Sequence, residues 1–186
     1  SRYDEARRSC DGLAPLATPL ITTACRAQVD AATGHAAAAA AALREALARQ
    51  PGASAEARLW ALTRLAETEE RRGPWAAAEA AFRDALALGL PDVYLQAAYA
   101  DFLLDRGRPA EVLALLDGRG RADVLLLRLA LAAKAAGHAS AGAHAQALAA
   151  RFAAARQRGD TSHQKEESRF LLGVQGNAAQ ALLLAQ

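Results

Sequence analysis

Apolar residues recur at helical spacing in the stretch RRGPWAAAEAAFRDALALGLP, which covers residues 71–91. The positions on this spacing are Trp75, Ala78, Phe82 and Ala85. Intervals of three and four residues place side chains on one face of an α-helix. A glycine comes before this face and a proline closes the stretch, so the pattern predicts one amphipathic helix between two turns.

Glycine and proline also divide the rest of the chain into segments. These segments have about 12 to 18 residues, which suits helices joined by short turns. Residues that favour strands are sparse, whereas the strong helix formers Ala, Leu, Arg, Glu and Gln dominate. The sequence therefore predicts an all-α protein. The expected helices lie near residues 2–13, 16–33, 36–49, 54–72, 75–89, 92–106, 109–117, 121–136, 139–157, 161–175 and 177–186.

The turn glycines are periodic. Gly73 and Gly107 are separated by about 34 residues, the length of one helix–turn–helix repeat. Gly34 lies before this pair at a slightly longer interval, and Gly137 and Gly176 continue the series after it. A period of about 34 residues with helix–turn–helix content is typical of a helical solenoid, in which stacked hairpins bury one another's apolar faces.

The stretch GPWAAAEAAFRDALALGLP resembles the tetratricopeptide repeat. That family has a turn glycine, an aromatic residue two positions on, an alanine, a second aromatic residue, Ala-Leu and a closing proline. GHAAAAAAALREALARQP is a second match, and Glu69 stands where the family usually has a tyrosine. The resemblance covers most of the chain, most strongly residues 34–91. It implies a right-handed α-solenoid of antiparallel helix hairpins with about four to five repeats.

On this interpretation residues 1–186 form a single superhelical domain. Neither end shows a polar capping helix, and the chain has no methionine, so we expect a solenoid truncated at both ends, as an internal or processed segment. Its units are a half repeat at 1–13 and hairpins at 16–49, 54–89, 92–117, 121–157 and 161–186.

Small and large apolar residues have different expected places in the packing. Ala66, Ala78 and Ala85 allow neighbouring helix backbones to approach toward the short end of the usual spacing of about 8–10 Å. Trp75 and Phe82 are expected to lie in the core. By contrast, the glutamates of LAETEERRG, which are Glu67, Glu69 and Glu70, are expected to be surface charge paired with arginines one helical turn away.

Composition argues against two classes of partner. The chain carries 22 basic and 20 acidic residues, a net charge of +2, so nothing drives it as a whole toward nucleic acid or an anionic membrane. Its longest apolar run, HAAAAAAALREAL, falls short of the roughly 20 apolar residues that a membrane span requires. We expect no nucleic acid partner and no direct membrane insertion. The excess of Arg over Lys, with abundant Ala and Gly, indicates a GC-rich bacterial coding sequence.

The two cysteines, Cys10 and Cys25, lie on neighbouring predicted helices. A disulfide between them is geometrically allowed, and it would imply an oxidising compartment, so that the protein would be periplasmic or secreted. Two free cysteines acting as small core residues fit the sequence equally well, and the protein would then be expected in the cytoplasm. The sequence leaves both alternatives open.

The sequence lacks the common catalytic and phosphate-binding motifs. It has no G-x-S-x-G, no phosphate-binding loop and no Ser-His-Asp signature. His163 and Glu167 lie one helical turn apart, but a metal site needs more ligands, so a solvated helix face is expected there. We therefore expect no enzyme, no catalytic or metal-binding residue and no cofactor.

In the tetratricopeptide family the first helix of each repeat lines a concave groove, and this implies candidates for partner binding. Trp60 and Tyr94 align one repeat apart and predict an aromatic ridge beside mixed charge. Aromatic residues and arginine are the usual hot spots of interfaces, although ordinary packing between helices fits each residue equally well. The candidates are Trp60, Thr63, Arg64, Glu67, Arg71, Tyr94, Asp101, Asp105, Arg128 and Lys134.

The resemblance implies a non-enzymatic scaffold that binds an unidentified peptide or protein segment in this groove by shape and charge complementarity. Two alternatives stay open: an RNA-binding helical repeat, and a helical accessory domain of a larger enzyme or membrane-associated complex. An RNA-binding repeat reads bases with polar side chains at fixed positions. The corresponding positions here are unlike one another and the charge is balanced, so this alternative is the weaker one.

Overall fold

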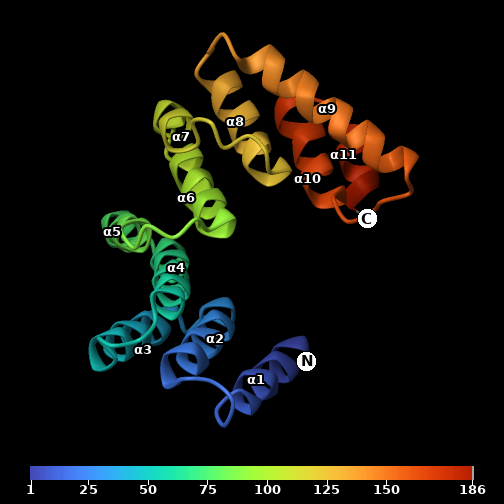
Figure 1. The fold of residues 1–186 in the computed structure, drawn as a ribbon. Coiled ribbons are helices and arrows are strands. Elements are labelled where there is room, and N and C mark those ends of the chain that lie inside the picture. Colours follow the sequence, from blue (N-terminus) through green and yellow to red (C-terminus); the bar gives the residue numbers. More distant parts are fainter. Residues whose placement is uncertain (186) are drawn as a thin grey trace. The chain divides into compact units, whose positions relative to one another are not determined.

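A computed structural model describes residues 1–185, and within them every regular element is a helix (Figure 1). The prediction of an all-α protein is confirmed. The elements are α1 (Arg2–Gly12), α2 (Pro19–Ala32), α3 (Ala36–Arg49), α4 (Ala55–Arg72), α5 (Trp75–Leu86), α6 (Val93–Asp105), α7 (Pro109–Leu115), α8 (Asp123–Ala135), α9 (Ala141–Gln157), α10 (Gln164–Phe170), the π-helix η1 (Leu171–Gln175) and α11 (Ala178–Ala185).

The helices lie close to their predicted bounds, and the differences have local causes. α2 begins later than expected because the Thr18 side chain accepts the N–H of Ile21 and Pro19 occupies the first turn. The predicted helix at 161–175 begins at Gln164, and its last five residues form η1. The helix predicted at 177–186 ends on residue 186, which lies outside the described residues.

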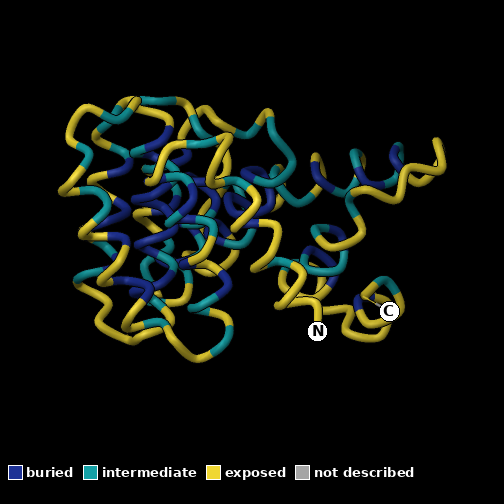
Figure 2. Tube along the Cα trace, turned by 90° about the horizontal axis from the view of Figure 1, so that it is seen from below, coloured by how far each residue is buried: buried dark blue, intermediate teal, exposed yellow. Residues whose placement is uncertain are grey.

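The chain divides into two compact units, Ser1–Leu95 and Gln96–Gln186. The boundary falls inside α6, so the first turn of this helix belongs to the first unit and the rest to the second. Each unit is described by itself. Buried segments follow the inner sides of the helices in both, and exposed segments mark the turns (Figure 2).

In the first unit α4 packs against α2, α3 and α5. Ala66, Ala78 and Ala85 are fully buried, as predicted for small residues between close helices, and Phe82 is buried with them. Gly73 ends α4 with φ 99° and ψ −17°, a left-handed conformation that glycine adopts without steric cost. The α4–α5 hairpin therefore forms as its sequence pattern indicated.

The prediction that Trp75 lies in the core is wrong, because its side chain is 56% exposed. Trp75 is the first residue of α5, and side chains in a helix tilt toward its N-terminus. A side chain on the first residue therefore points past the end of the hairpin. Tyr3, near the start of α1, is exposed in the same way.

The prediction that Glu69 is surface charge is also wrong. Its side chain is 0% exposed and lies between two arginines. Arg44 Nη2 donates to Oε1 at 2.5 Å, and Arg72 Nη1 donates to Oε2 at 2.6 Å. Arg44 belongs to α3, so this ion pair links α3 to α4 at the position where the tetratricopeptide pattern has a tyrosine. A buried charge is tolerated only when it is paired in this manner.

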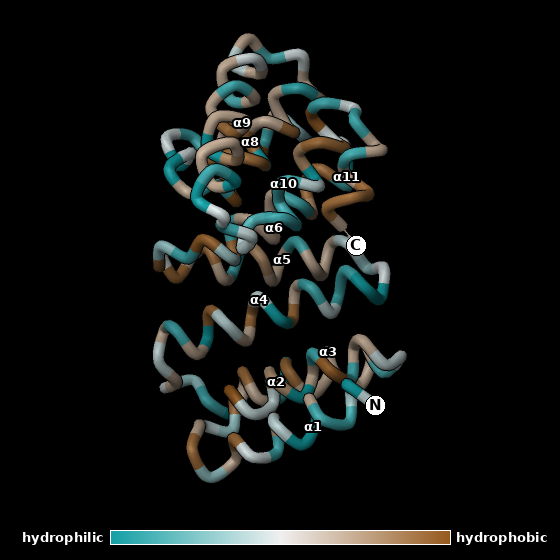
Figure 3. Tube along the Cα trace, turned by 90° about the vertical axis from the view of Figure 1, so that its right-hand side faces the viewer, coloured by the Kyte–Doolittle hydropathy of each residue, from teal (hydrophilic) through white to brown (hydrophobic). Residues whose placement is uncertain are grey.

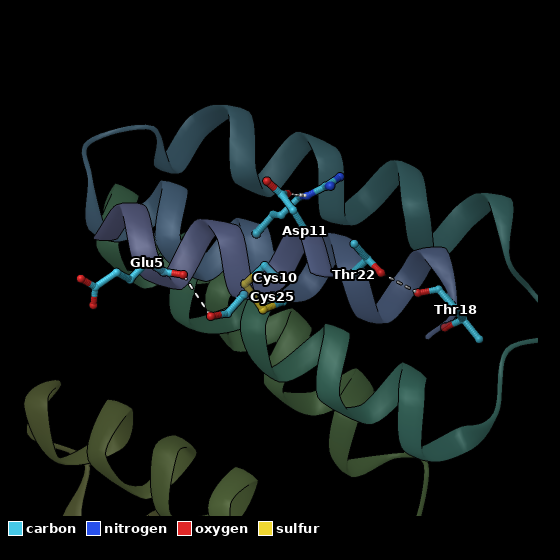
Figure 4. Close-up of a disulfide and its surroundings, with 8 residues drawn as sticks. Glu5, Cys10, Asp11, Thr18, Thr22 and Cys25 are labelled. Carbon is cyan, nitrogen blue, oxygen red and sulfur yellow. Dashed lines mark hydrogen bonds and ion pairs between the residues drawn. A yellow bond between two sulfur atoms is a disulfide. The ribbon is translucent and has the colours of Figure 1, made fainter. Parts of the chain in front are cut away.

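Cys10 and Cys25 form a disulfide that joins α1 to α2, with their Cα atoms 5.5 Å apart (Figure 4). Of the two alternatives that the sequence left open, the structure shows the bonded one. Cys10 is the buried residue of α1, which is otherwise mostly polar (Figure 3). Two ion pairs support the bond, Arg7 with Asp30 and Arg26 with Asp11. The disulfide therefore links α1 covalently to α2, and the two ion pairs join the same helices.

In the second unit α8 takes the central place, packing against α7, α9, α10 and η1, while α10 packs against α11. The core forms around two rings, Phe152 and Phe170, whose centres are 5.6 Å apart. Leu126, Leu127 and Leu148 are buried against these rings. Among residues 1–185, no helix is both long and apolar enough to cross a membrane.

Candidate binding site

Four of the residues predicted to face a partner line one hollow in the first unit. The hollow has a volume of about 350 Å³. Its lining residues are Leu59, Trp60, Thr63 and Arg64 of α4, with Asp92 and Tyr94 at the start of α6. The structure thus brings together Trp60, Thr63, Arg64 and Tyr94, and it adds Leu59 and Asp92, which were not predicted.

α4 presents its side of the hollow by helical spacing. Trp60, Thr63 and Arg64 are three and four residues apart, so they share one face. Ser54 caps the start of α4 by accepting the N–H of Ala57 at 3.2 Å, and Gly73 ends the helix. Between these two ends, α4 packs against α2, α3 and α5.

Asp92 orders the side of the hollow that is formed by the start of α6. Its Oδ1 accepts the backbone N–H of Leu95 at 2.6 Å, the arrangement of an N-cap, and it thereby holds the first turn of α6 that carries Tyr94. A signal for this role is present in the sequence, since an aspartate directly before a helix is a preferred N-cap. Asp92 therefore both orders Tyr94 and brings a carboxylate to the hollow.

Arg64, Glu67 and Tyr94 form a closed group beside the hollow. Arg64 Nη1 lies 2.9 Å from Glu67 Oε2, and the Tyr94 hydroxyl donates to Glu67 Oε1 at 2.5 Å. The Arg64 guanidinium lies over the Tyr94 ring, with its central carbon 4.5 Å from the ring centre. Ion pair, hydrogen bond and cation–π contact support one another, so each side chain holds the other two in place.

The pKa of Tyr94 is raised above its usual value of about 10. Partial burial is the largest cause, because it disfavours the charged phenolate, and the hydrogen bond to Glu67 adds to it. The charge of Arg64 acts in the opposite direction without cancelling the shift. Tyr94 is therefore a neutral hydrogen-bond donor over the whole physiological pH range.

Arg64 is only 5% exposed, and its Nε is buried without a hydrogen-bond acceptor among residues 1–185. Buried donors in proteins are nearly always satisfied. The Arg64 Nε is an exception, and it belongs to a residue that lines the hollow. This donor is the clearest polar feature that folding leaves unused in the first unit.

In the second unit, the predicted residues Asp101 and Arg128 meet in an ion pair. Arg128 donates from Nε and Nη2 to the two oxygens of Asp101 at 3.1 and 2.6 Å. Arg169 of α10, which was not predicted, donates to the same carboxylate at 2.9 Å. Burial alone would raise the pKa of Asp101, but the hydrogen bonds from Arg169 and Arg128 outweigh it and lower that pKa. The group joins α6, α8 and α10.

The other predicted site residues lie outside the hollow. Arg71 and Asp105 are exposed. Lys134 donates from Nζ to the carbonyl oxygens of Gly173 and Val174, at 2.9 and 2.8 Å. Lys134 therefore satisfies backbone acceptors of η1.

Metal-ligand chemistry finds no support in residues 1–185, where no group of three His, Cys, Asp or Glu side chains is placed to hold an ion. Glu167, expected on a solvated face with His163, is buried and paired with Arg156. The expectation of a solvated face is wrong for Glu167, because Arg156 of α9 packs over it.

Comparison with known proteins gave no match to a protein-family model, a curated protein or a solved structure. The likeness to the tetratricopeptide repeat accordingly rests on the residues of this chain.

Proposed function

We propose that this chain is a non-enzymatic tetratricopeptide-like scaffold that binds a peptide or protein segment on the first helices of its repeats. The observation that carries the proposal is the hollow in the first unit, which combines Trp60, Tyr94 and a buried arginine, Arg64. Trp, Tyr and Arg are the residue types that contribute most to protein interfaces. Contacts within the protein hold Arg64 and Tyr94 against each other without a partner, which lowers the entropy cost of binding.

A recurring contact supports the repeat interpretation. Glu67 is bonded by Tyr94, and Asp101 is bonded by Arg128; in both pairs the partners are 27 residues apart. The second pair is the first one displaced by one repeat, the interval that separates Gly73 from Gly107. A contact that recurs at the period of the sequence is expected when each first helix packs beside the next in the same way.

The size of the hollow favours a peptide side chain as its occupant. A volume of about 350 Å³ is at the lower end of the range for binding sites of small molecules, about 300–1,000 Å³. It suits one or two side chains of a bound segment. The segment itself would extend beyond the hollow along the helix face.

The disulfide supports a location in an oxidising compartment, periplasmic or secreted, because such bonds are rare in a reducing cytosol. A thiol titration of protein purified under native conditions, with and without reductant, tests this part of the proposal. We expect two thiols only after reduction. Two thiols in the untreated protein would contradict it.

Display selection of random peptides on the purified chain tests the scaffold function, in parallel with titration of single-stranded and duplex RNA at two salt concentrations. We expect the selection to enrich peptides that bind the chain with micromolar affinity and little dependence on salt. RNA binding that weakens steeply with salt, with no peptide enriched, would replace this proposal by the RNA-binding alternative.

A further inference from the structure

The guanidinium of Arg64 has an ion-pair partner and an aromatic partner within the protein. Nη1 is paired with Glu67, and the ring of Tyr94 covers the face of the group. Nε remains as a buried donor that has no acceptor among residues 1–185. Arg64 lines the hollow and is nine-tenths buried, so an acceptor supplied from the hollow would complete its hydrogen bonding.

The charges around the hollow define which acceptor fits. Arg64 contributes one positive charge, while Glu67 and Asp92 contribute two negative charges, which leaves an excess of one negative charge. Both oxygens of Glu67 are bonded, one to Arg64 and one to Tyr94. Asp92 uses Oδ1 on the N–H of Leu95, and its second oxygen has no hydrogen-bond partner among residues 1–185. A carboxylate ligand would therefore be repelled, whereas a neutral carbonyl with a cation nearby would be favoured.

The remaining lining is apolar. Leu59 and the rings of Trp60 and Tyr94 surround a space that fits one large apolar side chain. Burying an aromatic or branched aliphatic side chain there removes its surface from water. The hollow therefore presents three features together: an apolar space, a hydrogen-bond donor and a free carboxylate oxygen.

We infer that the hollow binds a peptide through one large apolar residue flanked by a basic residue. The apolar side chain enters between Trp60 and Tyr94. The main-chain carbonyl of the same residue accepts a hydrogen bond from Arg64 Nε, and the basic side chain pairs with Asp92. This inference rests on the proposed peptide-binding function, and it names the peptide class.

Two pairs of matched variants test the assignment. Trp60→Ala removes the apolar wall, and Trp75→Ala removes the other tryptophan of the chain, which is exposed on α5 and does not line the hollow. Arg64→Lys keeps a cation beside Glu67 but removes Nε. Arg49→Lys makes the same change at an exposed position of α3 that does not line the hollow. Circular dichroism and thermal unfolding of all four variants exclude loss of the fold as the cause of a change.

The experiment repeats the display selection of random peptides on the parent chain and on each variant, and then titrates the best peptide. Isothermal titration calorimetry gives the dissociation constant of the parent chain and of every variant. Fluorescence in a Trp75→Phe background, where Trp60 is the remaining tryptophan, reports on the surroundings of Trp60. We expect an enriched motif with Phe, Leu, Ile or Trp beside Lys or Arg, and a shift of the Trp60 emission on binding. Affinity falls at least tenfold in Trp60→Ala and Arg64→Lys, and less than twofold in the two control variants. Replacing the basic residue of the peptide by Glu weakens binding at least fivefold.

Two results would overturn the inference and are distinguishable. If peptides bind but the hollow variants match their controls, or the motif is acidic, the peptide site lies elsewhere and the scaffold function survives. If no peptide is enriched on the parent chain, the proposed function fails and the inference fails with it.

Discussion

The two units hold equivalent carboxylates and use them differently. Glu67 of the first unit and Asp101 of the second are 34 residues apart in the sequence, and each is bonded by a side chain 27 residues further along the chain. In the first unit that side chain is Tyr94, and a hollow lies beside it. In the second unit it is Arg128, and Arg169 binds the same carboxylate, so that two arginines share it.

The arginines show what this difference means. Arg128 uses all three guanidinium nitrogens inside the protein, two on Asp101 and the third on the carbonyl of Val124 at 3.0 Å. Arg64 leaves Nε unsatisfied beside a space that a ligand can enter. An arginine at this face of a first helix therefore stabilises the fold when its donors are satisfied internally, and it is available for recognition when one donor is left over.

Removal of the Asp101 carboxylate is expected to cause the largest loss of stability. Asp101→Ala leaves Arg128 and Arg169 without their common acceptor, and a partly buried pair broken in this way costs about 3 kcal/mol in the free energy of unfolding. Asp105→Ala, an exposed position one turn along α6, costs less than about 0.5 kcal/mol. Urea unfolding measures both. Equal effects would mean that the ion pair does not stabilise the second unit.

The next largest difference in stability is expected between two arginine-to-lysine substitutions, one in each unit. Lysine offers one compact charge in place of the planar fork of arginine, so Arg128→Lys loses hydrogen bonds and costs about 2 kcal/mol. Arg64→Lys keeps its single ion pair with Glu67 and costs about 1 kcal/mol or less. Urea unfolding of the two variants ranks them. A larger loss for Arg64→Lys would reverse the roles assigned to the two arginines.

Acid should weaken the second unit through Asp101. Its pKa in the folded state is lowered, so it stabilises the fold above the unfolded-state value of about 3.9, and this contribution is lost as the pH falls through the folded-state pKa. The difference in unfolding free energy between wild type and Asp101→Asn is therefore constant above about pH 5 and shrinks below about pH 4. Unfolding curves from about pH 7 down to about pH 2.5 measure it. A difference that is independent of pH would show that Asp101 titrates alike in both states.

The smallest expected effect concerns Tyr94. Its raised pKa means that the neutral phenol stabilises the fold below about pH 10, and that this contribution is lost as the pH rises through the higher folded-state value. Ultraviolet titration should show that Tyr94 ionises above its usual pKa, and Glu67→Gln should bring that step closer to the usual pKa. Because the residue is half exposed, Tyr94→Phe changes stability by less than about 1 kcal/mol. An unchanged titration in Glu67→Gln would contradict the hydrogen bond.

Much of the helical content and part of the site follow from local pattern. Glycine, proline and composition located the helices, and intervals of three and four residues put Trp60, Thr63 and Arg64 on one face of α4. The repeat period aligned Trp60 with Tyr94 from the sequence alone. The N-cap role of Asp92 was also readable, because it depends on the residue type at one position before a helix.

The missed features depend on residues that are distant in sequence. Glu69 looked like its neighbours Glu67 and Glu70, but Arg44 comes from 25 residues earlier and encloses it. Arg169 reaches Asp101 across 68 residues, and no helical spacing connects the two. Trp75 has the spacing of a core residue, yet its place at the very start of α5 puts it outside the packing.

Helix formation and the grouping of side chains on one face are properties of the sequence, because they depend on residues within about one turn of each other. Which charged side chains become buried, which of two cysteine alternatives holds, and which arginine keeps an unused donor are properties of the packed chain. They depend on what each helix meets across the interface, at separations from 15 residues for the disulfide to 68 for Arg169. The sequence therefore indicates Arg64 and Arg128 as similar residues, and the packing makes Arg128 part of a structural ion pair and Arg64 a candidate for recognition.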